Sequence, residues 1–428
     1  MFEIILFTIL GTVSGIFFGL IPGAGPFVAV AAMTPLLASY SASSIIAYYV
    51  AVLIATNYTN SVTAILYGIP GDATAISTAR YGHAFFRKGY GSYAVSSNAI
   101  SSTIGVIFAT LVFLIFYNNI ISVFSFYNSM LQTLIIFLAI ILITFFNKQN
   151  YIISIAFFVF GTVLSKIGID PVTFKSWGTF GIDWLTYGIP FSAVMIGLYL
   201  VPEILKIHSL DIKKPKQITK FNTGKNTLIP SLLGSFIGFW SGLIPGITNI
   251  LGSYASAKIV KRYFRLPNLK SIAAAEAANN SGALSSLLPL LILAIPITGS
   301  EVLVYYLVLE QGFTFNSQSI YTLIPILYCV PFIALFCMFI SWYGFNLLSN
   351  IVYFYKNYKW LINGIILTTI CTVSIAISSV KVWMIVCLFV LMVLGYILRY
   401  RDTTPILYGF FLGELLYESL TRTLVIIS

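Results

Sequence analysis

The stretch Gly11-Thr-Val-Ser-Gly15-Ile-Phe-Phe-Gly19-Leu20-Ile21-Pro22-Gly23 decides the fold, because a similar stretch occurs again later in the chain. The second copy is Gly234-Ser-Phe-Ile-Gly238-Phe-Trp-Ser-Gly242-Leu243-Ile244-Pro245-Gly246. Glycine at every fourth position lines one face of a helix and lets a second backbone approach closely. The Pro-Gly pair then ends the helix. Each copy therefore predicts a tightly packed helix that breaks and is followed by a second apolar stretch, which makes a broken or re-entrant hairpin.

The composition around these copies is that of a membrane protein. Of the 428 residues, 59% are hydrophobic and only 8% are charged, whereas a soluble domain carries about 25% charged residues. The apolar runs approach roughly 20 residues, the length at which a helix crosses the hydrocarbon core, and they lack the short alternating segments of a membrane β-barrel. The sequence therefore excludes a water-soluble fold and predicts an all-α, multi-pass protein of the cell membrane.

The loops explain the net charge of +11. Cytoplasmic loops of membrane proteins are enriched in Lys and Arg, whereas nucleic-acid binding needs basic residues massed on one solvated face. Residues 39–44, after the first hairpin, carry no charge. The equivalent loop of the second copy carries five bases, Lys258, Lys261, Arg262, Arg265 and Lys270. Equivalent loops thus lie on opposite sides of the membrane, and no nucleic-acid partner is expected.

The same contrast reverses further along each half. The first half has the bases Arg80, Arg87 and Lys88, where the second half has Glu301 and Glu310. We therefore expect two inverted-topology repeats, residues 1–207 and 226–428, joined by a basic cytoplasmic linker at 208–225. They contain about ten transmembrane helices, an odd number in each half, plus the broken hairpins. Consecutive spans are expected at 94–117 and 120–146, and both termini outside.

A second feature shared by the halves is a polar interruption of an apolar run. The first half has Asn57-Tyr-Thr59-Asn60-Ser61, followed by Pro70-Gly71-Asp72. The second has Glu276-Ala-Ala-Asn279-Asn280-Ser281, followed by Pro296. Polar or irregular backbone at membrane depth is tolerated only where protein shields it or where it lines a wet cavity. Paired broken segments in two repeats indicate a transporter's substrate site.

Four stretches of the sequence resemble one known family. They are residues 15–35, residues 57–89, residues 276–296, and the C-terminal run Leu407-Tyr-Gly409-Phe-Phe-Leu-Gly413-Glu-Leu-Leu-Tyr-Glu418-Ser-Leu. They resemble the large permease subunit of tripartite tricarboxylate transporters, the TctA family. The resemblance implies a secondary transporter that imports di- or tricarboxylates with a cation gradient. It also implies a small membrane subunit and an extracytoplasmic solute-binding protein as partners, and a homodimer is left open.

A carboxylate substrate must exchange its hydration for hydrogen-bond donors, which the N–H groups at broken helix ends supply without a buried base. We therefore expect substrate binding by amides, hydroxyls and hairpin glycines, namely Asn57, Thr59, Asn60, Ser61, Asn279, Asn280, Ser281, Gly23 and Gly246. The alternative is that these polar groups bind helices to one another. The breaks themselves are expected at Pro22, Pro70, Pro245 and Pro296.

Two acids are candidates for the coupling ion, which is Na⁺ or H⁺. Glu276 lies inside an Ala-rich crossing segment, where a carboxyl is costly unless it is paired or protonated. Asp72 follows a Pro-Gly break, and its alternative role is a helix N-cap. Glu301 is expected near the outer face as a solvated or gating residue. The four cysteines are scattered, so neither a metal site nor a disulfide framework is expected, and no cofactor is implied.

The sequence gives weaker support to two other function classes. An intramembrane hydrolase needs a catalytic set that is missing here, because Gly68-Ile-Pro-Gly71-Asp72 has the wrong spacing for an aspartyl protease and Ser14-Gly15 lacks the glycine of a serine protease motif. An enzyme is therefore not expected. A channel-like pore, or a stand-alone carrier for another solute, remains the alternative to a coupled carboxylate importer.

Overall fold

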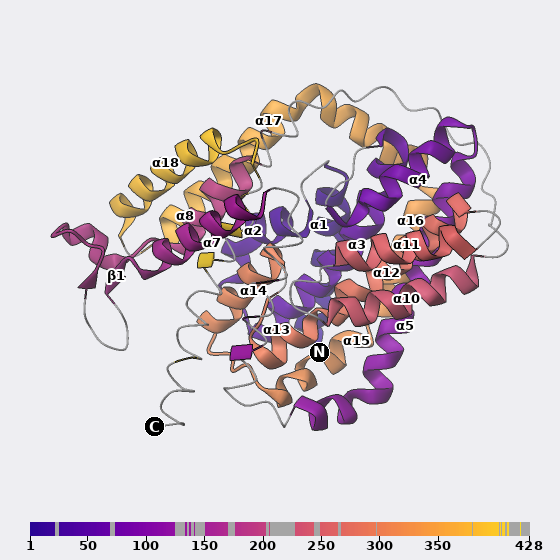
Figure 1. Ribbon diagram of the computed structural model, residues 1–428, viewed down its shortest axis with the longest axis horizontal. Coiled ribbons are helices and arrows are strands. Elements are labelled where there is room, and N and C mark those ends of the chain that lie inside the picture. Colours follow the sequence, from indigo (N-terminus) through magenta and orange to yellow (C-terminus); the bar gives the residue numbers. More distant parts are fainter. Residues whose placement is uncertain are drawn as a thin grey trace. The chain divides into compact units, whose positions relative to one another are not determined.

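The computed structural model describes residues 1–21, 25–68, 73–124, 133–134, 137, 141, 150–169, 176–202, 205, 227–243, 249–263, 267–296, 298–378, 380–401, 403, 405–406, 409–410 and 420. Almost all of the secondary structure in these residues is helical (Figure 1). The chain divides into two compact units, each made of one segment from each half of the sequence. Unit 1 is Met1–Phe126 with Asp211–Lys359, and unit 2 is Tyr127–Leu210 with Trp360–Ser428.

Six of the described helical elements of unit 1 come from the first half of the sequence. They are α1 (Phe2–Gly19), α2 (Gly25–Leu37), α3 (Ala42–Tyr67), the 3₁₀ turn η1 (Ala73–Ala75), α4 (Ile76–Arg87) and α5 (Gly91–Phe124). Helix α3 begins at Ser41, whose side chain accepts a hydrogen bond from the backbone N–H of Ser44. It ends at Gly68, which adopts a left-handed conformation with φ 67°.

The second half contributes the rest of unit 1. Its elements are α10 (Leu228–Gly242), α11 (Asn249–Tyr263), α12 (Pro267–Ser285), α13 (Leu287–Leu293), α14 (Gly299–Glu310), η4 (Ser317–Thr322), α15 (Leu323–Leu327), α16 (Val330–Tyr343) and the start of α17 (Phe345–Ile377). Helix α13 ends at Ala294, which has φ 58°. Helix α14 then begins at Thr298 with a capping box that Glu301 completes.

The two glycine stripes make the same kind of contact in unit 1. Helix α1 packs on α3, and helix α10 packs on α12 (Figure 1). A Cβ added at Gly11 would overlap the carbonyl oxygen of Tyr48, and one added at Gly234 would overlap that of Ala274. Only glycine allows this separation between backbones, so the repeated stretch forms two closely packed helix pairs.

Helix α12 lies at the centre of unit 1, in contact with α3, α4, α5, α10 and α11. Small residues permit this, because a Cβ at Gly105 of α5 would overlap the carbonyl oxygen of Ala277. Hydroxyl groups link the neighbours: Ser231 of α10 donates to Ser101 of α5 at 2.9 Å, and Ser256 of α11 donates to the carbonyl oxygen of Ala274 at 3.1 Å. The Ala-rich sequence of α12 thus places it where five helices surround it.

Unit 2 is smaller and follows the same packing principle. Its described elements are α7 (Tyr151–Lys166), the antiparallel pair β1 (Gly168–Ile169) and β2 (Ser176–Trp177), η2 (Asp183–Tyr187), α8 (Phe191–Val194), the π-helical η3 (Met195–Leu200), the end of α17 and α18 (Lys381–Ile397). Gly197 and Gly395 bring η3 and α18 into backbone contact. The indole N–H of Trp383 donates to the carbonyl oxygen of Gly188 at 2.7 Å.

Within the described residues, three helices are long and apolar enough to cross a membrane, namely Phe2–Gly19, Ala42–Tyr67 and Gly91–Ser122. A fourth span results if Ser317–Leu327 and Val330–Tyr343, which meet at 50°, act as one. Shorter apolar helices are Gly25–Thr34, Tyr151–Lys166, Leu228–Gly242 and Lys381–Ile397. The fold is therefore all-α as predicted, while the inverted repeats and the ten spans stay predictions.

One predicted boundary is wrong. The sequence predicts two spans separated near Asn118, but α5 continues without a break through Asn118 and Asn119 to Phe124. Both asparagines are exposed on the helix surface. Asparagine only weakens a helix modestly, and neither Gly nor Pro stands there to end it.

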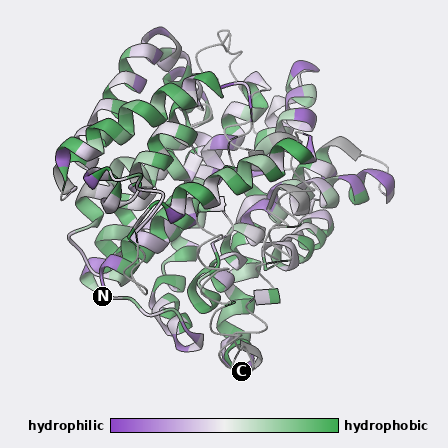
Figure 2. Cartoon of the chain, turned by 60° about the vertical axis from the view of Figure 1, so that its left-hand side comes forward, coloured by the Kyte–Doolittle hydropathy of each residue, from purple (hydrophilic) through white to green (hydrophobic). Residues whose placement is uncertain are grey.

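Apolar side chains cover the outside of the helices as well as their contacts. Figure 2 shows hydrophobic residues along most of the helical ribbon, with hydrophilic ones concentrated in short stretches. On α1 the large side chains of Ile9, Val13 and Phe17 are about half exposed or more, at 57%, 59% and 49%. A helix with apolar residues on both its packed and its exposed face is suited to a lipid environment.

Candidate functional site

The strongest candidate site surrounds the carboxyl group of Glu276, in the middle of α12. Glu276 is only 1% exposed. Its Oε1 accepts hydrogen bonds from the hydroxyl of Ser61 on α3, at 2.9 Å, and from the hydroxyl of Thr78 on α4. Its Oε2 accepts one from Ser102 of α5, at 3.3 Å. Three hydroxyl groups from three helices thus converge on one buried carboxyl, and we call these four residues the Glu276 cluster.

The close packing around α12 explains why these groups meet. Ala275 and Ala277 flank Glu276 and are fully buried, so α3, α4 and α5 approach the α12 backbone. Gly105, one turn beyond Ser102 on α5, lies directly against Ala277. Because α3, α4 and α5 belong to the first half and α12 to the second, the Glu276 cluster joins the two halves of the sequence.

Amides extend the Glu276 cluster along α12 and α5. The Nδ2 of Asn280 donates to the backbone carbonyl of Glu276 at 3.0 Å. Asn98 of α5 accepts a hydrogen bond from Ser102 at 3.3 Å. In the part of the chain that the structure describes, the Oδ1 atoms of Asn279 and Asn280 are buried and have no hydrogen-bond partner. The Nδ2 of Asn98 is likewise buried without a partner among the described residues, so the polar atoms left over near Glu276 include both amide oxygens, which suit a hard cation such as Na⁺, and an amide donor.

Two of the predicted substrate ligands, Thr59 and Ser281, make hydrogen bonds to a neighbouring helix. The hydroxyl of Thr59 donates to the carbonyl of Ala55 at 2.9 Å and reaches that of Gly15 on α1 at 3.5 Å. The hydroxyl of Ser281 donates to the carbonyl of Ser235 on α10 at 2.8 Å. These contacts match the alternative reading, in which a hydroxyl holds two close helices together.

The other predicted polar residues of α3 are buried near the Glu276 cluster. Asn57 and Asn60 are 4% and 1% exposed. The hydroxyl of Ser61 also donates to the carbonyl of Asn57, at 3.0 Å. One turn earlier than Ser61, Tyr58 shares a hydrogen bond of 2.7 Å with Thr103 of α5. The amide-rich stretch of α3 thus faces the protein interior and contributes Ser61 directly.

Three of the four predicted hairpin breaks, Pro22, Pro70 and Pro245, lie outside the described residues. The predicted substrate ligands Gly23 and Gly246 and the predicted coupling-ion ligand Asp72 lie outside them as well. Pro296 is described and buried, in the short connection between the end of α13 and the start of α14.

Sequence reasoning missed two of the three hydroxyl donors of the Glu276 cluster. Ser102 belongs to the polar run Ser96-Ser97-Asn98-Ala-Ile-Ser101-Ser102-Thr103, a third polar interruption within an apolar segment. That interruption was a usable signal, because polar groups at such a position need partners. Thr78 gave no comparable signal, since it lies in a short amphipathic helix beside the bases that indicate topology.

The prediction that Glu301 is solvated is wrong, because its side chain is fully buried. A gating role for Glu301 stays a prediction. Its Oε1 accepts a hydrogen bond from Ser286 at 2.5 Å, and its Oε2 accepts the backbone N–H of Thr298 at 3.0 Å. The capping box turns the carboxyl back into unit 1 rather than toward solvent.

A basic surface lies where α4 and α11 meet. The guanidinium carbon of Arg80 is 5.9 Å and the ammonium nitrogen of Lys261 is 5.5 Å from the centre of the Tyr81 ring. Arg80 comes from the first half and Lys261 from the second, and both are exposed. One base from a helix of each half, Arg80 of α4 and Lys261 of α11, thus contacts the same tyrosine ring.

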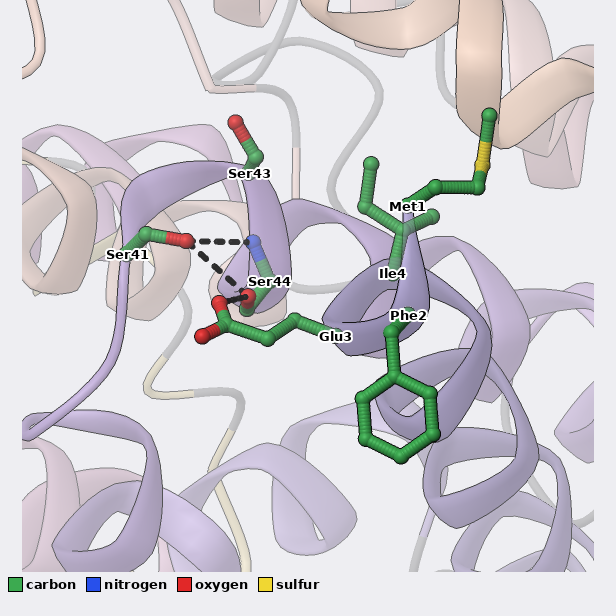
Figure 3. A pocket seen from close by; sticks show the side chains of 7 residues that line it. All are labelled: Met1, Phe2, Glu3, Ile4, Ser41, Ser43 and Ser44. Atoms are coloured by element: carbon green, nitrogen blue, oxygen red, sulfur yellow. Dashed lines mark hydrogen bonds between the residues drawn. The ribbon is translucent and has the colours of Figure 1, made fainter.

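The N-termini of α1 and α3 form an open hollow (Figure 3). In it Ser44 donates to Oε2 of Glu3 at 3.1 Å, and the hydroxyls of Ser41 and Ser44 lie 2.9 Å apart. These contacts accompany the N-cap of α3, so the hollow is explained by helix capping.

Apolar helices with apolar exposed faces, built around buried polar clusters, define an integral membrane protein with a polar interior, the architecture of transporters. A comparison with known families identifies the family of transporter components to which the chain belongs. A model of the tripartite tricarboxylate transporter TctA family matches residues 5–407. The chain belongs to this family, which is a family of transporter components and not of enzymes.

One curated relative is an uncharacterized 52.8 kDa protein from Agrobacterium vitis, whose name places it in the TAR-I ttuC′ 3′ region. It is 26% identical to this chain over 454 residues, covering 99% of the chain and 87% of the relative. No solved structure matches the chain.

Proposed function

We propose that this chain is the permease subunit that imports di- or tricarboxylates by cation-coupled alternating access, and that the Glu276 cluster binds the coupling cation. The observation that carries the proposal is the buried carboxyl of Glu276 with three hydroxyl groups around it, contributed by both halves of the sequence. Membership of the TctA family supports a tricarboxylate or a related carboxylate as the substrate.

The chemistry of the Glu276 cluster suits a coupling ion. A carboxyl within a membrane protein is costly unless a proton or a cation compensates its charge. Hydroxyl and carboxylate oxygens are the ligands that hard cations prefer. Occupation by Na⁺ or H⁺ would stabilise the contacts of α12 with α3, α4 and α5, so binding of the ion would be linked to the arrangement of these helices.

The division of the chain supports inverted repeats. Each compact unit takes one segment from residues 1–210 and one from the rest, as expected when two repeats are intertwined. Arg80 and Lys261, which the positive-inside rule places on the cytoplasmic side, lie against the same Tyr81 ring. Repeat interfaces are where transporters bind substrate and coupling ions.

We place the substrate beside this cluster, at Asn57, Asn60, Asn279 and Asn280; Gly23 and Gly246, which lie outside the described residues, stay predicted substrate ligands. Asparagine side chains donate as well as accept, and helix starts after the breaks offer N–H groups to a carboxylate. A small membrane subunit and an extracytoplasmic solute-binding protein would complete the transporter and deliver the substrate.

Uptake into proteoliposomes tests this function. The purified chain is reconstituted with and without the two partner subunits, and accumulation of ¹⁴C-labelled citrate, succinate and glucose is followed under an inward Na⁺ gradient, an inward proton gradient or no gradient. We expect accumulation of a carboxylate, but not of glucose, under one of the two gradients only. Equal flux without a gradient, at the rate of a pore, would contradict the proposal.

A further inference from the structure

Helix α11 carries a group of basic side chains on the side that does not pack against other helices. The helix contacts α10, α12 and α4 (Figure 1), and its residues Ser256 and Val260 are fully buried. Three bases of α11, Lys258, Lys261 and Arg262, are exposed. At 3.6 residues per turn they lie within an arc of about 100° around the helix axis. We call these three residues the α11 basic face.

An apolar strip runs beside the α11 basic face. Ile259 and Tyr263 lie one turn apart on the helix and are 43% and 73% exposed. Together with Ala255, Lys258 and Arg262 they line a hollow of about 260 Å³. One surface therefore offers positive charges and apolar contact area side by side.

Tyrosine rings accompany two of the bases. The ammonium nitrogen of Lys258 is 5.9 Å from the centre of the Tyr254 ring, and the guanidinium carbon of Arg262 is 5.9 Å from the centre of the Tyr263 ring. Tyrosine is enriched at the interface between membrane and water, because its ring is apolar and its hydroxyl is polar. These rings indicate that the α11 basic face lies at the level of the lipid headgroups.

The bases of this surface have no acids beside them in the sequence. Neither α11 nor the neighbouring α4, which carries Arg80 and Arg87, contains Asp or Glu. Lys258 and Arg262 are four residues apart, the spacing at which like charges destabilise a helix. An anion bound between these two bases would relieve their repulsion and would so stabilise α11.

Membrane topology and the helix dipole explain only part of the arrangement. The positive-inside rule depends on how many bases lie near the ends of the spans, and not on the helix face that they occupy. The dipole favours bases in the last turn of α11, which contains Lys261 and Arg262 but not Lys258. Neither effect requires an apolar strip and a hollow next to the bases.

We propose that the α11 basic face, with the hollow beside it, binds the headgroup of an anionic phospholipid. Lys258 and Arg262 hold the phosphate, while Ile259 and Tyr263 contact the adjoining hydrocarbon. Lys and Arg are the usual protein partners of phosphate, and basic surfaces at the membrane interface bind acidic headgroups. The apolar strip favours a lipid over a free anion, which has no hydrocarbon to place there. The inference does not depend on the proposed function.

Native mass spectrometry of the purified full chain in detergent tests this inference, with phosphatidylglycerol as the anionic probe and phosphatidylcholine as the zwitterionic one. We expect Lys258→Gln/Arg262→Gln to weaken the tightest phosphatidylglycerol binding about tenfold and to leave phosphatidylcholine binding unchanged, because two positive charges are lost. Lys258→Arg keeps the charge and is expected to bind like the wild type. Arg401→Gln is the matched control, because Arg401 is an exposed base of unit 2.

The substitutions lie on the exposed side of α11, so we expect the lipid-free variants to unfold at the temperature of the wild type. Unchanged phosphatidylglycerol binding in the double variant, the same loss in Arg401→Gln, or equal affinity of the wild type for both lipids would each overturn the inference. Competition gives two further tests. Release of phosphatidylglycerol by inorganic phosphate would assign the surface to a free anion, and its release by the small membrane subunit would assign the surface to a protein partner; either result would refute the lipid site.

Discussion

The two glycine-lined helix pairs have the same packing but different chemistry. Gly15 of α1 lies against Val52 of α3, and Gly238 of α10 lies against Ala278 of α12. Two residues before these contacts, α3 has the fully buried Val50, whereas α12 has Glu276. Equivalent places in the two copies thus hold an apolar side chain in one and a carboxyl in the other.

This difference shows how a repeated scaffold acquires a single site. Close packing requires small residues in both copies, so the sequence similarity is retained where backbones touch. A charged group at membrane depth is costly, so it is present in only one copy, and the other copy supplies neutral hydroxyls to it. The hydrogen bond from Ser61 of α3 to Glu276 of α12 is an example of this relation between the two copies.

The side of the membrane on which equivalent loops lie tests whether the two halves are inverted, and the expected effect is all or none. Ser41 and Lys261 follow the corresponding hairpins, and both are exposed. In a variant whose native cysteines are replaced, inverted repeats predict that a membrane-impermeant maleimide labels Ser41→Cys from outside and Lys261→Cys only from inside. Labelling of both positions from one side would show parallel repeats.

A Gly→Ala substitution in each glycine stripe compares how closely the two helix pairs pack at equivalent positions. A Cβ at Gly238 would overlap the carbonyl oxygen of Ala278, whereas one at Gly15 would lie 2.8 Å from the Cβ of Ala55. We expect Gly238→Ala to lower the free energy of unfolding by about 1–3 kcal/mol, and Gly15→Ala by less.

Thermal unfolding in detergent measures both effects. The control is Gly364→Ala, because an added Cβ there meets no atom within 4 Å and alanine is the better helix former. A control that destabilises the protein as much as Gly238→Ala would refute the packing account.

Removing single hydroxyls has a smaller effect and separates function from packing. Ser61→Ala and Ser102→Ala each delete one hydrogen bond to the Glu276 carboxyl. We expect each to raise the cation concentration that half-saturates uptake by roughly tenfold. Thr59→Ala is the matched control on α3, since its hydroxyl donates to backbone carbonyls only in the contacts described. Half-saturating cation concentrations for uptake give the answer, and equal shifts in Ser61→Ala and Thr59→Ala would contradict it.

The glycine stripes, the all-α class and the need of the Glu276 carboxyl for partners could be predicted, because each depends on a local pattern or on the cost of a buried charge. Thr78 could not be, because its contact with Glu276 depends on how α4 packs on α12. Glu301 was misjudged because a loop position in the sequence became the buried N-terminus of α14. The contributions of both halves to each unit also needed the three-dimensional structure, since sequence similarity reveals repeats but not how they interleave.

The central claim is that the charge of Glu276 couples a cation to uptake. The most direct test is uptake of labelled citrate into proteoliposomes by the wild-type chain and by Glu276→Gln, with and without an inward cation gradient and with matched thermal unfolding. The account predicts gradient-driven accumulation in the wild type and none in Glu276→Gln, although both proteins are folded. Accumulation by Glu276→Gln that still follows the gradient would contradict it.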